Sequence, residues 1–533
     1  MSEHATRPHT IERHADVAII GGSAAGLAAG LQLGRQRRSV IVVDAGEPRN
    51  APAAHLHGYL GHDGAAPADL LAVGREEVRR YGGEVLAGRV LDVERRAETD
   101  GGDFVLRLTG GHVVVARRVL LASGATDRLP DIDGLAERWG TRVIHCPFCH
   151  GYEVRDTRLV QIVTSAVGLH PAGLFAPLTD RLTLVLHDGV AADDPALDVF
   201  RSNGVEVVDG RVARLVDGAT DGAVVVELDD GRRFDADAVV VGSTVRANAD
   251  VVAGLGIVEV EHPGGFGTIV EVDPFGATSV AGVYAAGNVV DPSVQLLHAA
   301  ATGSRTGAMI AADLVHEDMA AGGRSSANER DWDRRYSGEA IWSGRPNGSL
   351  VAELSDARPG TALDVGAGEG GDVVWLAERG WDVVASDISE RGLDRIRNIA
   401  DERRLDIACL RADANDVEPY GSRRYDLVTA HYASIPRTAD DRGVANLLAA
   451  VGDGGTLLVV SHDLAPMRTP IDTTEHSRGF DPDAYVRVDD VVAAIDGDAG
   501  WRIEVFETRP RPGGHAAGHV DDVVLRARRI SAV

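Results

Sequence analysis

The sequence predicts an α/β fold, and three observations support this prediction. An apolar strand runs into a glycine turn and then a helix near residue 21, and the same pattern returns near residue 366. Short apolar strands alternating with helices fill the last third of the chain. With 533 residues, the chain is long enough for three or four domains, each with its own core.

Charge and composition exclude several partners and chemistries. Acidic residues outnumber basic ones by 81 to 54, which gives a net charge of −27 at pH 7. Such a negative field repels nucleic acid and anionic membrane surfaces, so we expect neither as a partner. The chain contains no lysine, because all 54 basic residues are arginine, and this excludes lysine-dependent Schiff-base chemistry.

The N-terminal segment MSEHATRPHTIERHADV is polar and lacks the apolar core of a signal peptide. No uncharged apolar run is long enough to span a bilayer. We therefore expect a cytoplasmic protein. In that compartment thiols stay reduced, and a C-x-x-C pair is usually catalytic or metal-binding.

The stretch HCPFCHGYE, residues 145–153, holds two of the three cysteines. Its pattern is typical of haem c attachment, of a zinc site or of a redox disulfide. Haem c attachment takes place outside the cytosol, which disfavours the first alternative. Zinc needs four converging ligands, and the side chains of close sequence neighbours diverge. The four residues in question are His145, Cys146, Cys149 and His150. A redox pair is the favoured interpretation, and we expect no metal.

The first glycine turn has the features of a dinucleotide site. Residues 16–44 read as strand DVAII, turn GGSAAG, a helix and strand VIVVD. The helix N-terminus offers backbone N–H groups to a pyrophosphate, and an acid at the end of the second strand accepts hydrogen bonds from ribose. Ser23 stands where the fingerprint has its middle glycine. The candidate cofactor contacts are Gly21, Gly22, Ser23, Gly26 and Asp44.

Further motifs follow in a fixed order: GGSAAG, ASGATDRLP, CPFCH and AAGN. Over residues 14–318, this order resembles the thioredoxin reductase group of two-domain flavoproteins. The resemblance implies two Rossmann-like nucleotide-binding domains, with FAD bound by residues 14–125 and 241–318 and an NAD(P)-type domain inserted at 126–240. Asn288 replaces the family's aspartate facing the flavin ribityl chain, and an amide can still hydrogen-bond a hydroxyl. The implied FAD contacts in this region are Gly287, Asn288 and Gln295.

The same resemblance implies that the cysteine pair cycles between dithiol and disulfide against the flavin. By position, Cys149 should face the flavin and Cys146 should exchange with the substrate. A spacing of three residues at a helix start brings both sulfurs to one face, where the helix lowers the thiol pKa. His150 stands where thioredoxin reductases have an acid. Its imidazole suits a proton shuttle, and a helix-capping surface histidine is the alternative.

The expected NADPH turn, LVQIVTSAVGLH at 159–170, departs from the family pattern. Val163 and Ser165 occupy the two turn-glycine positions, where a β-carbon crowds an approaching pyrophosphate. Asp188 follows the next strand, where arginines would hold the 2′-phosphate of NADPH and an acid repels it. NADPH remains a candidate cofactor that these residues disfavour. The sequence is equally compatible with small-molecule dithiol oxidases, relatives that pass electrons from a dithiol through flavin to oxygen.

A second enzyme is predicted beyond a polar linker at 319–330. TALDVGAGEGG opens a series of seven strands, the last two able to form a hairpin. Over 331–533 this pattern resembles the class I S-adenosylmethionine (SAM)-dependent methyltransferases, with a seven-stranded Rossmann-like fold. The implied SAM contacts are Asp364, Gly366, Gly368, Gly370, Asp387 and Asp413. His431 and Tyr432 follow the fourth strand, where methyl acceptors bind, although either could simply be a packing residue.

Together these patterns predict a bifunctional enzyme, a flavin disulfide oxidoreductase joined to a methyltransferase. Its expected partners are a small thiol or dithiol, or a thioredoxin-like disulfide, and a small methyl acceptor; a homodimer is among the expected assemblies. One alternative is an oxygen-dependent dithiol oxidase whose second half S-methylates thiols. Another keeps one half catalytic and makes the other a binding or redox-sensing module.

Overall fold

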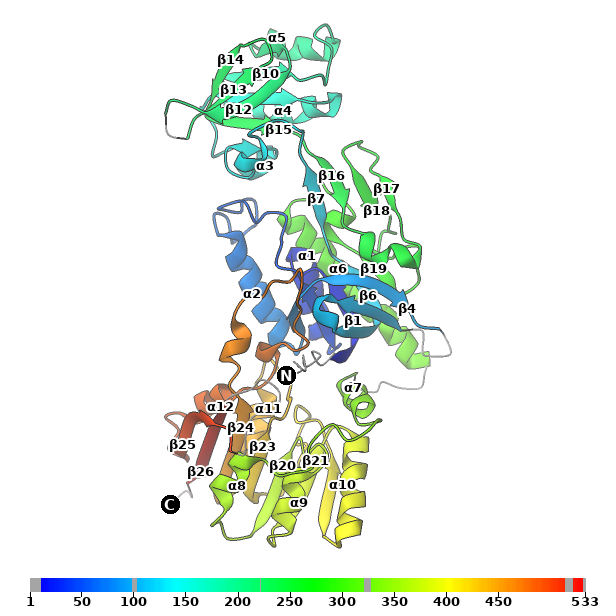
Figure 1. Ribbon diagram of the computed structural model, residues 1–533, viewed down its shortest axis with the longest axis vertical. Helices are drawn as coiled ribbons and strands as arrows, with labels where there is room; N and C mark the ends of the chain where they lie inside the picture. The colour runs from blue at the N-terminus through cyan, green and yellow to red at the C-terminus, as the bar shows by residue number, and fades with distance from the viewer. Residues whose placement is uncertain (1–10, 98–102, 221, 321–326, 513–520, 531–533) are drawn as a thin grey trace, which may run out of the picture.

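The computed structural model describes residues 11–97, 103–220, 222–320, 327–512 and 521–530. Figure 1 shows three lobes in a row. The first lobe (11–124 and 248–320) lies in the middle, between the inserted lobe (129–243) and the C-terminal lobe (327–530). Among the described helices, none is long and apolar enough to cross a membrane.

A mostly parallel sheet forms the core of the first lobe, with strand order β3-β2-β1-β6-β5-β4 and β19 paired to β6. Its strands are β1 (Glu12–Ile20), β2 (Val40–Asp44), β3 (Glu84–Ala87), β4 (Val90–Arg95), β5 (Phe104–Leu108), β6 (Val113–Leu121) and β19 (Val283–Ala285). β1, β2, β6 and β19 run parallel, so their carboxyl ends meet at one edge. This edge brings together Gly21, Asp44 and Gly287, which lie far apart in sequence.

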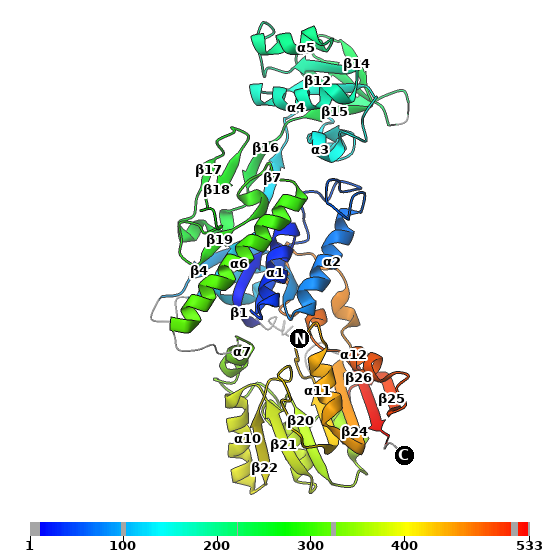
Figure 2. The ribbon, with the colours of Figure 1, turned by 180° about the vertical axis from the view of Figure 1, so that it is seen from behind.

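Three helices belong to this lobe: α1 (Ala24–Arg35), α2 (Pro67–Arg80) and α6 (Leu296–Ala320). Figure 2 shows α1 and α6 side by side. Their approach requires glycine, because a Cβ added to Gly303 would lie 2.0 Å from the Ala25 carbonyl oxygen. A small antiparallel pair, β17 (Glu259–Glu261) and β18 (Thr268–Val270), lies beside the sheet.

The inserted lobe has its own parallel sheet, in the order β11-β10-β9-β15-β8. Its elements are β8 (Val143–Ile144), α3 (Pro147–His150), β9 (Leu159–Val163), α4 (Leu169–Phe175), β10 (Leu182–Leu186), α5 (Asp198–Ser202), β11 (Glu206–Asp209), β12 (Val212–Asp217), β13 (Val224–Leu228), β14 (Arg233–Ala236) and β15 (Ala238–Val241). The antiparallel pair β7 (Ala125–Arg128) and β16 (Thr244–Ala247) connects it to the first lobe (Figure 1). Two extended segments thus form the whole covalent connection.

The C-terminal lobe contains the predicted seven-stranded sheet, in the order β22-β21-β20-β23-β24-β26-β25. Its strands are β20 (Thr361–Val365), β21 (Asp382–Asp387), β22 (Ile407–Arg411), β23 (Tyr425–His431), β24 (Val451–His462), β25 (Trp501–Pro510) and β26 (Asp521–Arg529). Its helices are α7 (Ala327–Arg335), α8 (Gly348–Leu354), α9 (Gly371–Ala377), α10 (Glu390–Arg403), α11 (Arg442–Ala450) and α12 (Val488–Ile495). The predicted terminal hairpin is confirmed, since β25 and β26 pair antiparallel.

The predicted linker needs a correction at both ends. Helix α6 extends to Ala320 and α7 begins at Ala327, while residues 321–326 lie outside the described residues. α7 contacts the first lobe: the His14 amide donates to Asp331 at 3.1 Å, and Arg330 pairs with Asp16 at 3.0 Å. Some of the polar residues that predicted a linker therefore belong to α7, and their charges pair with residues of the first lobe.

A second segment of the C-terminal lobe, residues 473–485 (the strap), lies along the first lobe. Asp481 accepts hydrogen bonds from Arg79 and from the Val85 amide, both at 2.8 Å. At the other end of the strap, the Thr473 hydroxyl donates to the Ala45 carbonyl at 2.8 Å. Ala45 follows Asp44, so the strap reaches the strand end that is predicted to bind the FAD ribose. Because these groups are largely buried, separating the lobes would leave polar atoms without partners.

The C-terminal lobe presents the carboxyl edge of its sheet to the first lobe. After β21, the Ser389 hydroxyl donates to Asp333 of α7 at 2.5 Å. After β23, Arg437 pairs with Glu76 of α2 at 2.9 Å. After β24, the chain continues into the strap. The edge that carries the glycine turn at 366–370 therefore faces the junction between the two lobes.

Candidate redox and methyl-transfer sites

The first glycine turn leaves no space for side chains. Gly21 has φ of +113°, and a Cβ there would lie 2.3 Å from the Ala122 carbonyl oxygen. A Cβ on Gly26 would lie 1.9 Å from the Gly21 carbonyl oxygen, and one on Gly22 would lie 2.3 Å from Cγ of Asp44. Ser23 occupies the N-cap position of α1 but makes no side-chain cap. The first backbone amides of the helix are therefore not capped by this side chain. The turn, the helix start and the acid are therefore directly adjacent.

Asp44 is held in place by its neighbours. Its Oδ2 pairs with Arg75 at 2.9 Å, and its Oδ1 accepts the Gly46 amide at 2.8 Å. The sequence predicted Asp44 as a ribose contact but gave no signal for Arg75, which lies in α2. A carboxylate fixed in this way keeps one orientation, which is what recognition of two ribose hydroxyls requires.

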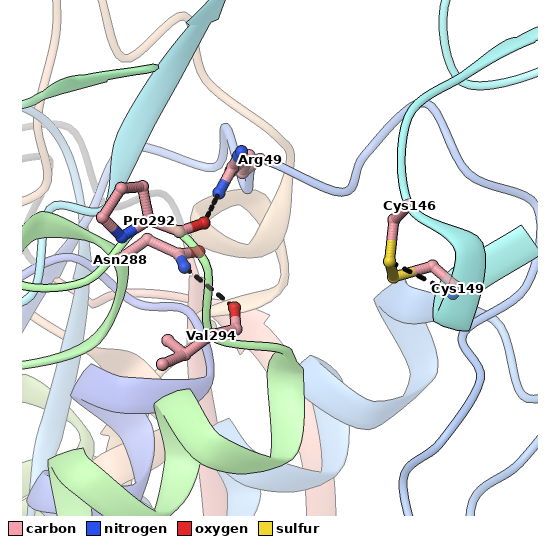
Figure 3. The surroundings of a disulfide bond; sticks show 6 residues. All are labelled: Arg49, Cys146, Cys149, Asn288, Pro292 and Val294. Carbon is pink, nitrogen blue, oxygen red and sulfur yellow. Dashed lines mark hydrogen bonds between the residues drawn. A yellow bond between two sulfur atoms is a disulfide. The ribbon is translucent and has the colours of Figure 1, made fainter. Parts of the chain in front are cut away.

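The second flavin element begins at Gly287, where φ is +79° and a Cβ would lie 2.8 Å from Cβ of Ala25. Next to it, the amide nitrogen of Asn288 donates to the Val294 carbonyl at 3.0 Å (Figure 3) and to the Asp291 carbonyl at 3.2 Å. With its nitrogen used in this way, Asn288 can offer its carboxamide oxygen to a ligand hydroxyl. Gln295 lies just before α6, and its Oε1 comes within 3.5 Å of where a Gly58 Cβ would be.

The two cysteines form a disulfide at the start of α3, with Cα atoms 5.2 Å apart (Figure 3). Cys146 is the N-cap residue, and its Sγ accepts the Cys149 amide at 3.2 Å. A thiolate formed at Cys146 after reduction would keep this amide donor, which stabilises negative charge on sulfur.

Both histidines beside the disulfide are neutral at neutral pH, because their pKa values are lowered. Burial lowers the pKa of His150, with nearby Glu153 opposing and His57 adding to the effect. Its Nδ1 is buried without a hydrogen-bond partner. Burial also lowers the pKa of His145 to about 4, and its ring stacks on Trp139 at 5.2 Å between centroids. A neutral His150 is able to accept a proton when a thiol reacts.

An ion pair fixes the arm that carries the inserted lobe. Arg49 Nε donates to Asp127 of β7 at 2.7 Å, and its NH1 donates to the Pro292 carbonyl at 2.8 Å (Figure 3). The Ser243 hydroxyl donates to the same carboxylate at 2.6 Å. The sequence analysis missed this group because its members come from four segments and none follows a recognised motif.

The turn expected to hold NADPH packs against the backbone of Gly189. β9 ends at Val163, which is fully buried. A Cβ on Gly189 would lie 2.4 Å from the Ser165 amide nitrogen and 2.4 Å from the Val163 carbonyl oxygen, so backbone covers this turn. Asp188 has φ of +53° and its carboxylate lies 3.5 Å from Arg211. The positions predicted to disfavour NADPH therefore carry side chains next to a tightly packed backbone crossing.

The glycine turn of the C-terminal lobe bends around one carboxylate. Gly366, Gly368 and Gly370 all have positive φ, at +74°, +55° and +91°. The Gly368 amide donates to Asp387 at 2.8 Å. Burial raises the pKa of Asp387, while backbone amides stabilise its charged form. Asp413, at the end of the next strand, is half-buried, and burial likewise raises its pKa. The predicted SAM residues therefore line one strand edge.

Aromatic residues cover this turn. A Cβ on Gly368 would lie 3.2 Å from the Tyr336 hydroxyl and 3.6 Å from Nε1 of Trp342. The buried Glu369 holds the covering segment by accepting the Ile341 and Trp342 amides at 3.3 and 2.8 Å. Tyr336 is itself buried, and burial together with the nearby Asp387 charge raises its pKa.

The side chains of the two predicted acceptor residues have different partners in the structure. His431 points to α9, where its Nδ1 lies 2.8 Å from Asp372. Tyr432 has φ of +51°, stacks on His462 and donates to the buried Asp522 at 2.8 Å. The sequence gave no signal for Asp372 or Asp522, because each meets its partner only through the folded sheet.

Comparison with known proteins identifies both parts of the chain. Residues 15–303 match the family described as pyridine nucleotide-disulphide oxidoreductase. The chain belongs to this family. Residues 362–455 match a methyltransferase domain family, so the chain also carries a methyltransferase domain. The predicted recognition of a thioredoxin reductase-like part followed by a methyltransferase part is confirmed.

The relatives match the oxidoreductase part. Thioredoxin reductase sirT of Leptosphaeria maculans is 30% identical over 319 residues, which is 57% of this chain and 96% of the relative. Thioredoxin reductase tcpT of Claviceps purpurea is 31% identical over 279 residues, 51% and 86% of the two chains. Among solved structures, HlmI is 40% identical with a TM-score of 0.54, covering 59% of this chain and 95% of its own. An oxidoreductase from Agrobacterium tumefaciens is 35% identical with a TM-score of 0.53, covering 57% and 99%.

These families imply FAD and NADPH for the oxidoreductase part and SAM for the methyltransferase domain. The residues fit FAD, since the turn at Gly21 and Gly26 lacks any obstructing side chain beside Asp44. They also fit SAM, whose ribose and adenine would lie by Asp387 and Asp413. For NADPH the match is poorer, because Val163 and Ser165 stand at the two turn-glycine positions and the backbone of Gly189 packs against this turn.

Replacing Gly26 by alanine is expected to yield flavin-free protein. The new Cβ would overlap a backbone oxygen, which no rotamer change relieves, and such overpacking costs roughly 1–3 kcal/mol or more. The flavin absorbance of the purified variant measures the outcome. Gly30→Ala is the matched control on the same helix, because its Cβ would meet only side-chain methyls of Val78 and Val42 at 3.2 and 3.3 Å. Equal flavin content in Gly26→Ala and wild-type protein would contradict the predicted site.

Proposed function

We propose that the oxidoreductase part of this protein is a small-molecule dithiol oxidase, and that its methyltransferase domain methylates a small acceptor. The observation that favours oxidation over NADPH-driven reduction is the turn at Val163–Ser165, which lacks both expected glycines and packs against the backbone of Gly189. Without a nicotinamide cofactor, the electrons must enter through the Cys146–Cys149 pair. A dithiol substrate supplies them at that pair.

The chemistry begins at the disulfide. One substrate thiolate attacks Sγ of Cys146 and forms a mixed disulfide, and Cys149 leaves as a thiolate. The second substrate thiol then attacks its own sulfur in the mixed disulfide, which releases the oxidised substrate and leaves both cysteines reduced. FAD, when bound, would take two electrons from this pair and pass them to oxygen as the terminal acceptor. Each cycle therefore forms one substrate disulfide, and the two electrons and two thiol protons reduce one oxygen molecule to hydrogen peroxide.

His150 is assigned the proton transfers in this cycle. Its imidazole is neutral at physiological pH because burial lowers its pKa, so it can take a proton from an incoming thiol. Its unpartnered Nδ1 leaves one ring nitrogen available. The Cys149 amide, which contacts Sγ of Cys146, favours the thiolate form of that sulfur.

Both halves are proposed to act on small thiols. A thiol is partly ionised near neutral pH, so its methylation needs little help compared with that of an alcohol or amide. However, α3 and the methyltransferase sheet lie on opposite sides of the first lobe (Figures 1 and 2). A shared thiol would therefore reach the two sites by diffusion, and oxidation and methylation would compete for it.

A competition assay tests this function. Holoprotein receives dithiothreitol, oxygen and SAM together, and oxygen uptake, disulfide and S-methyl products are measured. We expect dithiol-dependent oxygen uptake and a second, SAM-dependent loss of thiol. Absence of oxygen uptake across a panel of dithiols would refute the oxidase. Methylation of oxygen or nitrogen acceptors alone would refute the shared-substrate assignment while leaving the oxidase intact.

A further inference from the structure

His431 is a buried histidine with one unused nitrogen. It is the last residue of β23, and its side chain is 2% exposed. Its Nδ1 lies 2.8 Å from Oδ2 of Asp372, while its Nε2 is buried without a hydrogen-bond partner. When a carboxylate holds one imidazole nitrogen, the ring orientation and the tautomer are fixed and the other nitrogen is left to accept a proton.

The carboxylates around His431 are satisfied by the protein itself. Asp372 also accepts the Asn347 amide, which begins α8, at 2.5 Å. Asp364, on the neighbouring strand β20, accepts the Thr429 hydroxyl at 2.6 Å. Besides the imidazole, each carboxylate therefore has a hydrogen-bond donor within the protein. Nε2 of His431 is the atom of this cluster that has no hydrogen-bond partner.

The cluster encloses the turn expected to hold SAM. Asp364 precedes Gly366–Gly370 at the end of β20, and Asp372 follows the same turn in the first turn of α9. β20 and β23 are adjacent parallel strands, so Asp364, Thr429 and His431 lie along one face at their carboxyl ends. Both acids and the imidazole are therefore positioned at the methyl-transfer end of the sheet.

We infer that His431, oriented by Asp372, is the proton acceptor in methyl transfer, and that the acceptor substrate is a protic group such as a thiol or hydroxyl. This inference rests on the proposed methyltransferase activity. As the acceptor heteroatom bonds to the methyl carbon, the carbon–sulfur bond of the sulfonium breaks and its electron pair stays on sulfur. The acceptor proton moves to Nε2 of His431. Asp372 is a positioning residue that stabilises the resulting imidazolium.

The charges facing His431 set the pH dependence of this role. Burial opposes its protonation, but the hydrogen bond to Asp372 and the charges of Asp372, Asp364 and Asp522 outweigh burial and raise its pKa. Burial, followed by the Asp372 charge, raises the pKa of Asp364 to about 7. A base must be neutral to accept a proton, so methyl transfer should increase as pH rises through the raised pKa of His431.

The test uses FAD-loaded full-length protein, with dithiothreitol as the thiol probe and a phenol as the hydroxyl probe. His431→Gln should lower methyl transfer to the phenol roughly 10²-fold or more, because general bases contribute that much. Transfer to dithiothreitol should fall less, because a thiol is already partly ionised near neutral pH. Asp372→Asn should lower the rate and move the rising limb of the pH profile to lower pH. SAM affinity by calorimetry should remain within about threefold of wild type, which is less than 1 kcal/mol. Glu378→Gln, an exposed change at the end of α9, is the control.

A second readout does not depend on turnover. Histidine-labelled NMR should show the His431 imidazole titrating above its ordinary pKa in wild-type protein and at lower pH in Asp372→Asn. Retained activity with an unchanged pH profile in His431→Gln would overturn this inference and leave the methyltransferase proposal standing. Loss of SAM binding in parallel with activity would instead make the pair structural and also overturn it. If wild-type protein methylates neither probe, both proposals fail.

Discussion

Serine in place of Cys146 or Cys149 is expected to lower dithiol-dependent oxygen uptake by about three orders of magnitude or more. Each cysteine has a step that the other cannot perform, since Cys146 exchanges with the substrate and Cys149 is the leaving thiolate that faces the flavin. The disulfide lies in the inserted lobe, at the start of α3, whereas the flavin residues lie on the edge of the first lobe. Flavin content should therefore stay at the wild-type level in both variants.

The chain provides its own control for these variants. Cys409 lies in β22 of the methyltransferase domain, is half-buried and is not bonded to another cysteine. Cys409→Ser should leave oxygen uptake unchanged, with flavin absorbance and oxygen consumption measured side by side. If Cys146→Ser or Cys149→Ser keeps normal uptake, the pair is structural and the proposed electron path is wrong.

Much of the fold was predictable because certain turns admit only glycine. Gly21 and Gly287 both have positive φ, Gly21 lies against the backbone of Ala122 and Gly287 against the side chain of Ala25, and each stands at the end of an apolar strand. A strand followed by such a turn and a helix is a local signal. The seven strands of the methyltransferase domain were predicted in the same way, from their apolar pattern and their order along the chain.

The missed residues share a different property, because each acts through a partner distant in sequence. Asp372 contacts His431 across 59 positions, and Arg49 contacts Asp127 across 78. Charged residues are common on surfaces, so no local pattern distinguishes these from solvent-exposed ones. The sheet order that places β20 beside β23 brings Asp372 to His431, and the fold likewise brings Arg49 to Asp127 of β7.

The contacts of the strap also join residues that are distant in sequence and could not be predicted. Residues 473–485 contain no recognisable motif, yet Arg79 and Asp481 meet across 402 positions and Thr473 reaches the carbonyl after Asp44. The sequence predicted only a polar linker at 319–330 between the two halves. The buried pairs between the lobes instead hold the methyltransferase edge against the oxidoreductase part, since each separated charge would lose its partner.

NADPH is expected to reduce the bound flavin at least about 100-fold less efficiently than a dithiol does. Side chains at Val163 and Ser165 replace the glycines that let a pyrophosphate approach backbone amides. A hydrogen bond to a charged group is worth about 1.5–3 kcal/mol, and 2.7 kcal/mol corresponds to about 100-fold in affinity. Asp188 adds repulsion, because its carboxylate lies where the 2′-phosphate would bind. The measurement is anaerobic flavin bleaching in a stopped-flow instrument, with NADPH, NADH and dithiothreitol compared at equal concentration.

A double variant at this turn provides the comparison for a negative result with NADPH. Gly189 packs its backbone against Ser165 and Val163, so changing those two residues to glycine would remove side chains but not the covering backbone. The double variant Val163→Gly and Ser165→Gly should therefore remain poorly reduced by NADPH. Its dithiol-dependent reduction should match that of the wild type, because the cysteine pair is untouched. Rapid bleaching of the wild-type flavin by micromolar NADPH would show that the turn opens in solution, and the reductase function of the family would then apply to this chain.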